Sequence, residues 1–94
     1  MLYLECEVRK PAGLRESDVL AVIRDHTGVR EQIEVESSFL VQRRGRYFLP
    51  VWAVVQDPIN KLVEVELPQE SAGGTNRVWV LAEQVFYQKE ETPA

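Results

Sequence analysis

The fold of this chain is decided by three short apolar segments in its second half: 48–55 (FLPVWAVV), 62–68 (LVEVELP) and 77–81 (RVWVL). Each segment is rich in β-branched and aromatic residues, and each is bounded by residues typical of turns. This pattern predicts strands of a small sheet or barrel. Pro50 lies inside the first segment, so the strand there must be an edge, a bulge or a bend, because proline has no N–H to donate to a ladder.

The first residues of the chain show the same strand pattern. Leu2, Leu4, Cys6 and Val8 alternate with polar residues, which predicts a half-buried strand with these four side chains facing the core. The segment 61–67 alternates in the same way, so one of its faces is also expected to be buried.

Turn residues separate the expected strands. A short strand over 39–41 is followed by an arginine- and glycine-containing turn at 43–46, and a proline turn follows at 57–60. The polar loop 69–76 holds two glycines and no large apolar side chain, so we expect it to be the most mobile internal segment.

Residues 17–28 fit two interpretations. As a helix, Ser17 would be the N-cap and Gly28 would end the helix. As a strand, 19–23 would be followed by a hairpin loop over 25–28 with the glycine in the left-handed conformation. The alternating segment 29–36 follows directly, and this favours the hairpin.

The segment 79–86 (WVLAEQVF) resembles the end of SH3-like small barrels, in which an aromatic-bearing strand is followed by a single 3₁₀ turn and a short final strand. The resemblance covers about 29–86 and lies at the level of the fold. It implies a binding module built on a small closed sheet.

We therefore expect one mainly β domain over 1–87, a small SH3-like barrel or sandwich of about six to seven short antiparallel strands. The alternative is an α+β fold with one helix near 17–26 packed on an antiparallel sheet. The polar segment 88–94 is expected to be a flexible tail.

Composition narrows the class of protein. The 94 residues carry a net charge of −4, which disfavours a dedicated nucleic-acid binder because such domains usually have a basic excess. No signal-peptide pattern and no apolar run of about 20 residues is present. The expectation is a cytoplasmic protein that does not enter the membrane.

No catalytic, metal or nucleotide motif is present, so no enzyme activity, metal or cofactor is predicted. The single cysteine, Cys6, is on the apolar phase of its strand, where thiols are usually buried and inert. His26, the single histidine, is expected to be a solvated loop residue. The carboxylate pairs are expected to face lysines and arginines of neighbouring strands; they are Glu5 with Glu7, Glu34 with Glu36, and Glu64 with Glu66.

The turn at 43–46 is the first candidate binding site. Arg43, Arg44 and Arg46 beside Tyr47 are residue types that grip phosphates while an aromatic ring stacks on a base. This gives the alternative hypothesis of a nucleic-acid-binding small barrel. The other interpretation is a solvated turn whose arginines pair with glutamates.

The two tryptophans are the second candidate. On 77–81, Val78 and Val80 point one way and Trp79 the other, so either side can be the outer face. An exposed Trp52 or Trp79, with Tyr47, would anchor a partner, because tryptophan and tyrosine are common at interface hot spots. The favoured hypothesis is a non-enzymatic interaction module that binds a protein partner or itself.

Overall fold

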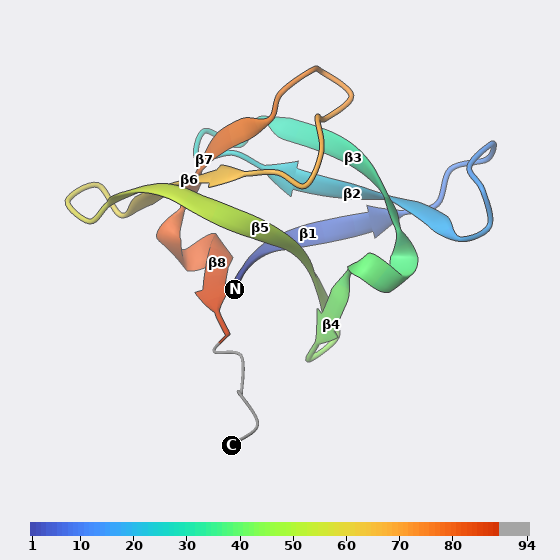
Figure 1. Ribbon diagram of the computed structural model, residues 1–94, viewed down its shortest axis with the longest axis horizontal. Helices are drawn as coiled ribbons and strands as arrows, with labels where there is room; N and C mark the ends of the chain where they lie inside the picture. Colours follow the sequence, from blue (N-terminus) through green and yellow to red (C-terminus); the bar gives the residue numbers. More distant parts are fainter. Residues whose placement is uncertain (89–94) are drawn as a thin grey trace.

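The computed structural model describes residues 1–88, which form one antiparallel sheet of eight strands curled into a half-barrel (Figure 1). The strands are β1 (Leu2–Arg9), β2 (Asp18–Arg24), β3 (Arg30–Glu36), β4 (Val41–Arg43), β5 (Arg46–Asp57), β6 (Leu62–Glu66), β7 (Arg77–Leu81) and β8 (Val85–Tyr87). Two 3₁₀ turns, η1 (Ser37–Phe39) and η2 (Ala82–Gln84), precede β4 and β8. The mainly β prediction is confirmed. The strands number eight rather than six to seven, and two of them, β4 and β8, are only three residues long.

The sheet curls because β1 and β5 each pair with different strands along their length. The order is β3-β2-β1-β5-β6-β7, with β4 beside β5 and β8 beside β1. The first half of β5 pairs with β1 and β4, and its second half pairs with β6. A register shift between Ala53 and Val55 marks a bulge, and bulges bend a strand and increase its twist.

Pro50 sits just before this bulge. It lies opposite Tyr3 of β1 and is buried. On the other edge of β5, the pairing with β4 ends at Phe48 and the pairing with β6 begins at Trp52. Pro50 therefore occupies the short stretch where β5 changes partner on that edge, so its missing N–H costs no ladder bond there. Of the predicted alternatives, an edge, a bulge or a bend, the structure places Pro50 at an unpaired stretch of one edge of β5, and the bulge follows between Ala53 and Val55.

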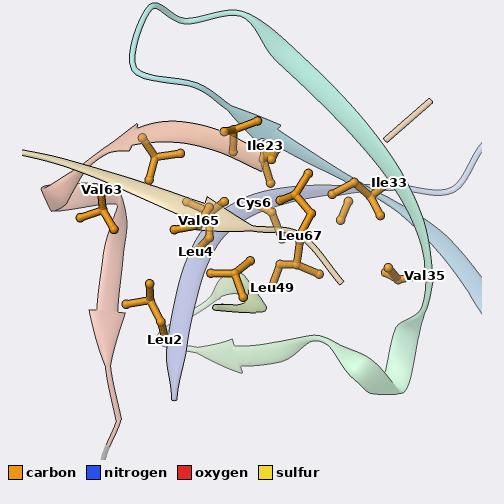
Figure 2. Close-up of a cluster of buried hydrophobic side chains, with 14 of the residues drawn as sticks. Leu2, Leu4, Cys6, Ile23, Ile33, Val35, Leu49, Val63, Val65 and Leu67 are labelled. Carbon is orange, nitrogen blue, oxygen red and sulfur yellow. The ribbon is translucent and has the colours of Figure 1, made fainter. Parts of the chain in front are cut away.

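The core fills the inside of the curl, where side chains from most of the strands meet (Figure 2). Leu2, Leu4 and Cys6 are buried and Val8 packs against them, as the alternation predicts. The other buried members come from β2, β3, β5, β6 and β7 and from Leu67. Most are β-branched, and their stiff side chains suit a pleated surface.

Residues 18–24 are the strand β2, so the helix of the α+β alternative is wrong. The strand pairs with β3 along its whole length, from Asp18 opposite Glu36 to Arg24 opposite Arg30. Gly28 has a φ of 90°, as the hairpin interpretation requires. The segment forms a strand despite its helix signals because the hairpin gives every residue of β2 a cross-strand partner in β3.

Two loop predictions need correction. Phe39 belongs to η1 rather than to a strand, and the strand begins at Val41. The loop 69–76 is anchored rather than loose, although its anchors are polar. Ser71 is buried and its hydroxyl donates to Glu31 of β3 at 2.9 Å, while the Ala72 N–H donates to the Gln32 carbonyl at 2.8 Å.

The Asp25 side chain fastens the β2–β3 turn. Its Oδ1 accepts hydrogen bonds from the Thr27 N–H (2.8 Å), the Thr27 hydroxyl (2.6 Å) and the Val29 N–H (3.0 Å). Partial burial raises the pKa of Asp25, but these hydrogen bonds outweigh it and hold the pKa below the ordinary 3.8.

Replacing Asp25→Ala is expected to lower the unfolding free energy by about 1 kcal/mol at neutral pH, since three hydrogen bonds to a partly exposed carboxylate are lost. A group with a depressed native pKa stabilises the fold above its unfolded pKa and loses that contribution as pH falls. Urea denaturation at pH 7 and at pH 2 checks both statements. An equal loss at the two pH values would contradict the charged role of Asp25.

The chain ends of the described part meet beside β8, as Figure 1 shows. The Gln88 N–H donates to the Met1 carbonyl at 3.0 Å, and the Met1 ammonium donates back to the Gln88 carbonyl at 3.0 Å. The predicted tail over 88–94 otherwise lies outside the described residues. Within residues 1–88, no helix has the length and apolar character needed to cross a membrane.

Candidate functional site

Trp52 and Trp79 lie on the same face of the β5–β6–β7 segment. Cross-strand partners share a face, and the ladder places Trp52, Glu66 and Arg77 in one row, and Val55, Glu64 and Trp79 in another. Val78 and Val80 point the opposite way and are buried in the core. The open question about β7 is thereby resolved: its valines face inward and Trp79 faces outward, half-buried.

The second half of β5 exposes a contiguous apolar stretch. Trp52 is 48% exposed, Val54 39% and Val55 46%, and we call these three residues the β5 patch. Within residues 1–88, the segment Ala53 to Asp57 pairs only with β6, so its other edge is open. An open edge with large exposed apolar side chains is a common site of pairing with another chain.

A hollow of about 370 Å³ opens next to Trp52. It lies where the edge of β5 passes from β4 to β6, near the end of β3 and the start of the β6–β7 loop, residues 67–76. The lining residues are Val35, Glu36, Phe39, Trp52, Pro68 and Gln69. Phe39 is itself 40% exposed, so two aromatic side chains face a partly open, mainly apolar concavity.

The predicted arginine site at the β4–β5 turn is divided between two faces. Arg44 and Gly45 have φ values of 53° and 77°, which is the geometry of a tight type I′ hairpin turn. Arg43 lies opposite Arg46, whereas Tyr47 points to the core side with Cys6 as its partner. The structure therefore brings Arg43 and Arg46 together but places Tyr47, 37% exposed, on the other face.

Both flanking arginines already have partners inside the chain. The Arg43 guanidinium lies 5.2 Å from the centre of the Phe86 ring, and Arg46 is 3.5 Å from a carboxylate oxygen of Glu5. Arg44 occupies the exposed tip of the turn. Arg46 thus pairs with a glutamate, as the interpretation of a solvated turn expects, whereas Arg43 lies over an aromatic ring.

An aromatic cluster on the outer side of β1 and β8 was not predicted. Phe86 stacks on Tyr3 with ring centres 5.1 Å apart and meets Phe48 edge-on at 4.8 Å. The sequence signal is that Tyr3 and Phe48 occupy the phase opposite to the core residues of their strands. All three rings are half-buried, and they pack against one another as a second, smaller cluster.

The carboxylate pairs differ in their partners. Glu7 lies 3.4 Å from Arg24 and 3.8 Å from Arg9, Glu5 lies near Arg46, and Glu66 lies 3.7 Å from Arg77. The prediction that such carboxylates face cations is confirmed for these three. Within residues 1–88, Glu34, Glu36 and Glu64 make no ion pair.

Cys6 and His26, the single cysteine and the single histidine of the chain, lie in different surroundings. His26 is exposed in the β2–β3 turn, where its backbone N–H donates to the Trp79 carbonyl at 2.8 Å. Cys6 is buried beside a polar hollow of about 230 Å³, which is also lined by Glu5, Glu7, Val22, Arg24 and Gln84. Burial, and secondarily the negative charge of Glu5, raises the pKa of the Cys6 thiol from 9.0 to about 12.

Alkylation of Cys6 in the native protein is therefore expected to be slow. At pH 8 the thiolate fraction falls about 1,000-fold when the pKa rises from 9.0 to about 12, and the thiolate is the reactive form. The rate of reaction with iodoacetamide should be at least about 100-fold lower in the native protein than in denaturant. Similar rates in the two states would contradict a buried, protonated thiol.

Comparison of the chain with family models, with curated proteins and with solved structures finds no match.

Proposed function

We propose that this protein is a non-enzymatic interaction module that binds a protein partner, or a second copy of itself, through the β5 patch and the adjoining tryptophan face. The observation that carries the proposal is the exposure of Trp52, Val54 and Val55 on one short stretch of strand. Trp52 is about half exposed, and tryptophan is among the residue types most often found at interface hot spots. Large exposed apolar patches are characteristic of interaction surfaces.

The open edge of β5 supports the same function. A strand with one free edge offers main-chain groups to an incoming extended segment, and the exposed side chains then determine which segment fits. Between Phe48 and Gln56 the strand has no charged side chain, so it lacks the charges that often protect edge strands from pairing. The bulge at Val54 limits how long such a pairing can be.

The SH3-like interpretation of the fold belongs to this proposal. In its favour, β7 is followed by the 3₁₀ turn η2 and by the short strand β8, which is the order that the segment 79–86 predicts. Small barrels of this kind commonly present a side face to peptides or nucleic acids.

Nucleic-acid binding through Arg43, Arg44, Arg46 and Tyr47 receives less support. Tyr47 and the two flanking arginines lie on different faces of the hairpin, and the net charge of −4 opposes binding to a polyanion. Nucleic-acid binding is one of the outcomes that the photocrosslinking experiment distinguishes.

Site-specific photocrosslinking tests the proposal. A benzophenone amino acid replaces Val55 in one variant and Ala12, an exposed residue of the β1–β2 turn, in a control variant. In an extract of the source cells, or in the purified protein at rising concentration, we expect covalent protein adducts at position 55. They should disappear when Trp52→Ala is added.

Two results would overturn the proposal. One is an adduct yield at position 55 no higher than at position 12, together with a monomeric protein at all concentrations. The other is adduct formation with nucleic acid instead of protein.

A further inference from the structure

A second hollow adjoins the one beside Trp52 and extends it toward the start of β2. The two share Val35, Glu36 and Gln69, and the second, of about 320 Å³, adds Arg15, Asp18 and Glu34. Gln69 also donates from its side chain to the Glu34 carbonyl, which fixes the 67–76 loop against β3. Together the hollows form one rim groove with an apolar end at Phe39, Trp52 and Pro68 and an acidic end at Asp18, Glu34 and Glu36.

The acidic end holds negative charge that the fold does not balance. The β2–β3 register sets Asp18 directly opposite Glu36, and like charges facing each other across an antiparallel ladder are destabilising. Within the part of the chain that the structure describes, Asp18, Glu34 and Glu36 form no ion pair, in contrast to Glu5, Glu7 and Glu66.

Cations near this end do not cancel the charge. Arg15 is the one guanidinium among the residues that line the groove, against three carboxylates. The Lys10 ammonium donates to the main-chain carbonyls of Arg15, Glu16 and Asp18 rather than to a carboxylate. A cation from outside the chain would relieve the repulsion between Asp18 and Glu36.

We propose that the rim groove binds a basic segment of a partner protein, with a lysine or arginine beside an apolar residue. The aliphatic stem of the basic side chain lies on Trp52 and Phe39, and its charged end reaches Glu36, which lines both hollows. Long basic side chains cover apolar surface while their charged ends remain solvated. Guanidinium and ammonium groups are also attracted to aromatic faces.

This inference rests on the proposed function and adds the chemistry of the partner. Charge complementarity selects the occupant: an acidic peptide, or the phosphates of a nucleic acid, would add to the repulsion at Asp18, Glu34 and Glu36. A second copy of this chain brings a net charge of −4, so it is also a poorer occupant of the acidic end than a basic peptide.

Fluorescence anisotropy with three labelled peptides of one pattern tests the inference. The peptides alternate leucine with arginine, with glutamine or with glutamate. We expect the arginine peptide to bind most tightly, and its binding to weaken as salt is added. Glu36→Gln should weaken it about fivefold, as expected for loss of one exposed charge contact. Glu83→Gln, the same charge change at an exposed residue of η2 outside the groove, should have no effect.

The outcomes separate the inference from the proposed function. Tighter binding of the arginine peptide, sensitive to Glu36→Gln and insensitive to Glu83→Gln, supports the inference. Equal binding of the arginine and glutamine peptides, unaffected by Glu36→Gln but lost in Trp52→Ala, overturns the basic-partner chemistry and leaves the proposed function standing. No binding of any peptide overturns the inference, and absence of the photocrosslinked adducts at position 55 overturns the proposed function as well.

Discussion

Trp52→Ala is expected to weaken binding of the protein partner by about 30-fold or more, which is the effect of removing a hot-spot side chain worth at least about 2 kcal/mol. The indole is 48% exposed in the free chain, lines the apolar end of the rim groove and belongs to the β5 patch. It is the one side chain that both proposed contacts share. Removing the indole therefore weakens binding through the β5 patch and binding through the rim groove.

The same substitution should alter stability little. Because half of the indole is already in water, the unfolding free energy is expected to fall by less than about 1 kcal/mol. Tyr47→Ala serves as the control, since it removes an exposed aromatic ring from the hairpin beside the arginines. Calorimetric titration with the partner protein identified by photocrosslinking measures the binding affinity of both variants. Normal affinity in Trp52→Ala with weakened affinity in Tyr47→Ala would move the binding site to the arginine turn.

Leu4→Ala is expected to lower the unfolding free energy by about 3 kcal/mol, because a fully buried leucine is truncated where the sheet cannot easily collapse. Leu4 has no exposed surface and lies opposite Leu49 of β5 on one side and Val85 of β8 on the other. A domain of this size has a total stability of about 5–15 kcal/mol, so the loss is a large part of the whole.

Urea denaturation monitored by tryptophan fluorescence measures this loss. Ile59→Ala is the matched control, since Ile59 is an apolar residue 90% exposed in the β5–β6 turn and its truncation should change the unfolding free energy by less than about 0.5 kcal/mol. Equal effects of the two substitutions would contradict the position of β1 at the centre of the sheet.

Local patterns predicted most of the fold. The period of two located β1, β3 and β6, because each has one face in the core and one in water, and the short apolar run 77–81 located β7. The signals for 17–28 were divided, since Ser17 and Gly28 are as suitable for the ends of a helix as for a hairpin. Only pairing with β3 along the full length of β2 decides between them, and that is a non-local property.

The candidate site was predicted in part. Trp52 was recognised from its residue type, but Phe39 and Glu36 were not, because the rim groove joins the end of β3, η1 and the bend of β5. Those elements come together because the sheet curls, and short sequence patterns do not predict the curvature of a sheet. The hairpin interpretation with a loop at 25–28 would pair Arg24 with Val29 and Asp18 with Val35. The observed register pairs Arg24 with Arg30 and so sets Asp18 opposite Glu36, which the sequence did not indicate.

Binding at Trp52 is tested most directly with the two indole N–H signals of the ¹⁵N-labelled protein, one from Trp52 and one from Trp79. The protein is titrated with the arginine–leucine peptide, with its own unlabelled copy, and with short RNA and DNA at low and at physiological salt. We expect the Trp52 signal to shift with the peptide or with the second copy and to stay unchanged with nucleic acid at physiological salt. Two unmoved indole signals, with backbone shifts confined to 43–48 on addition of nucleic acid, would contradict this expectation.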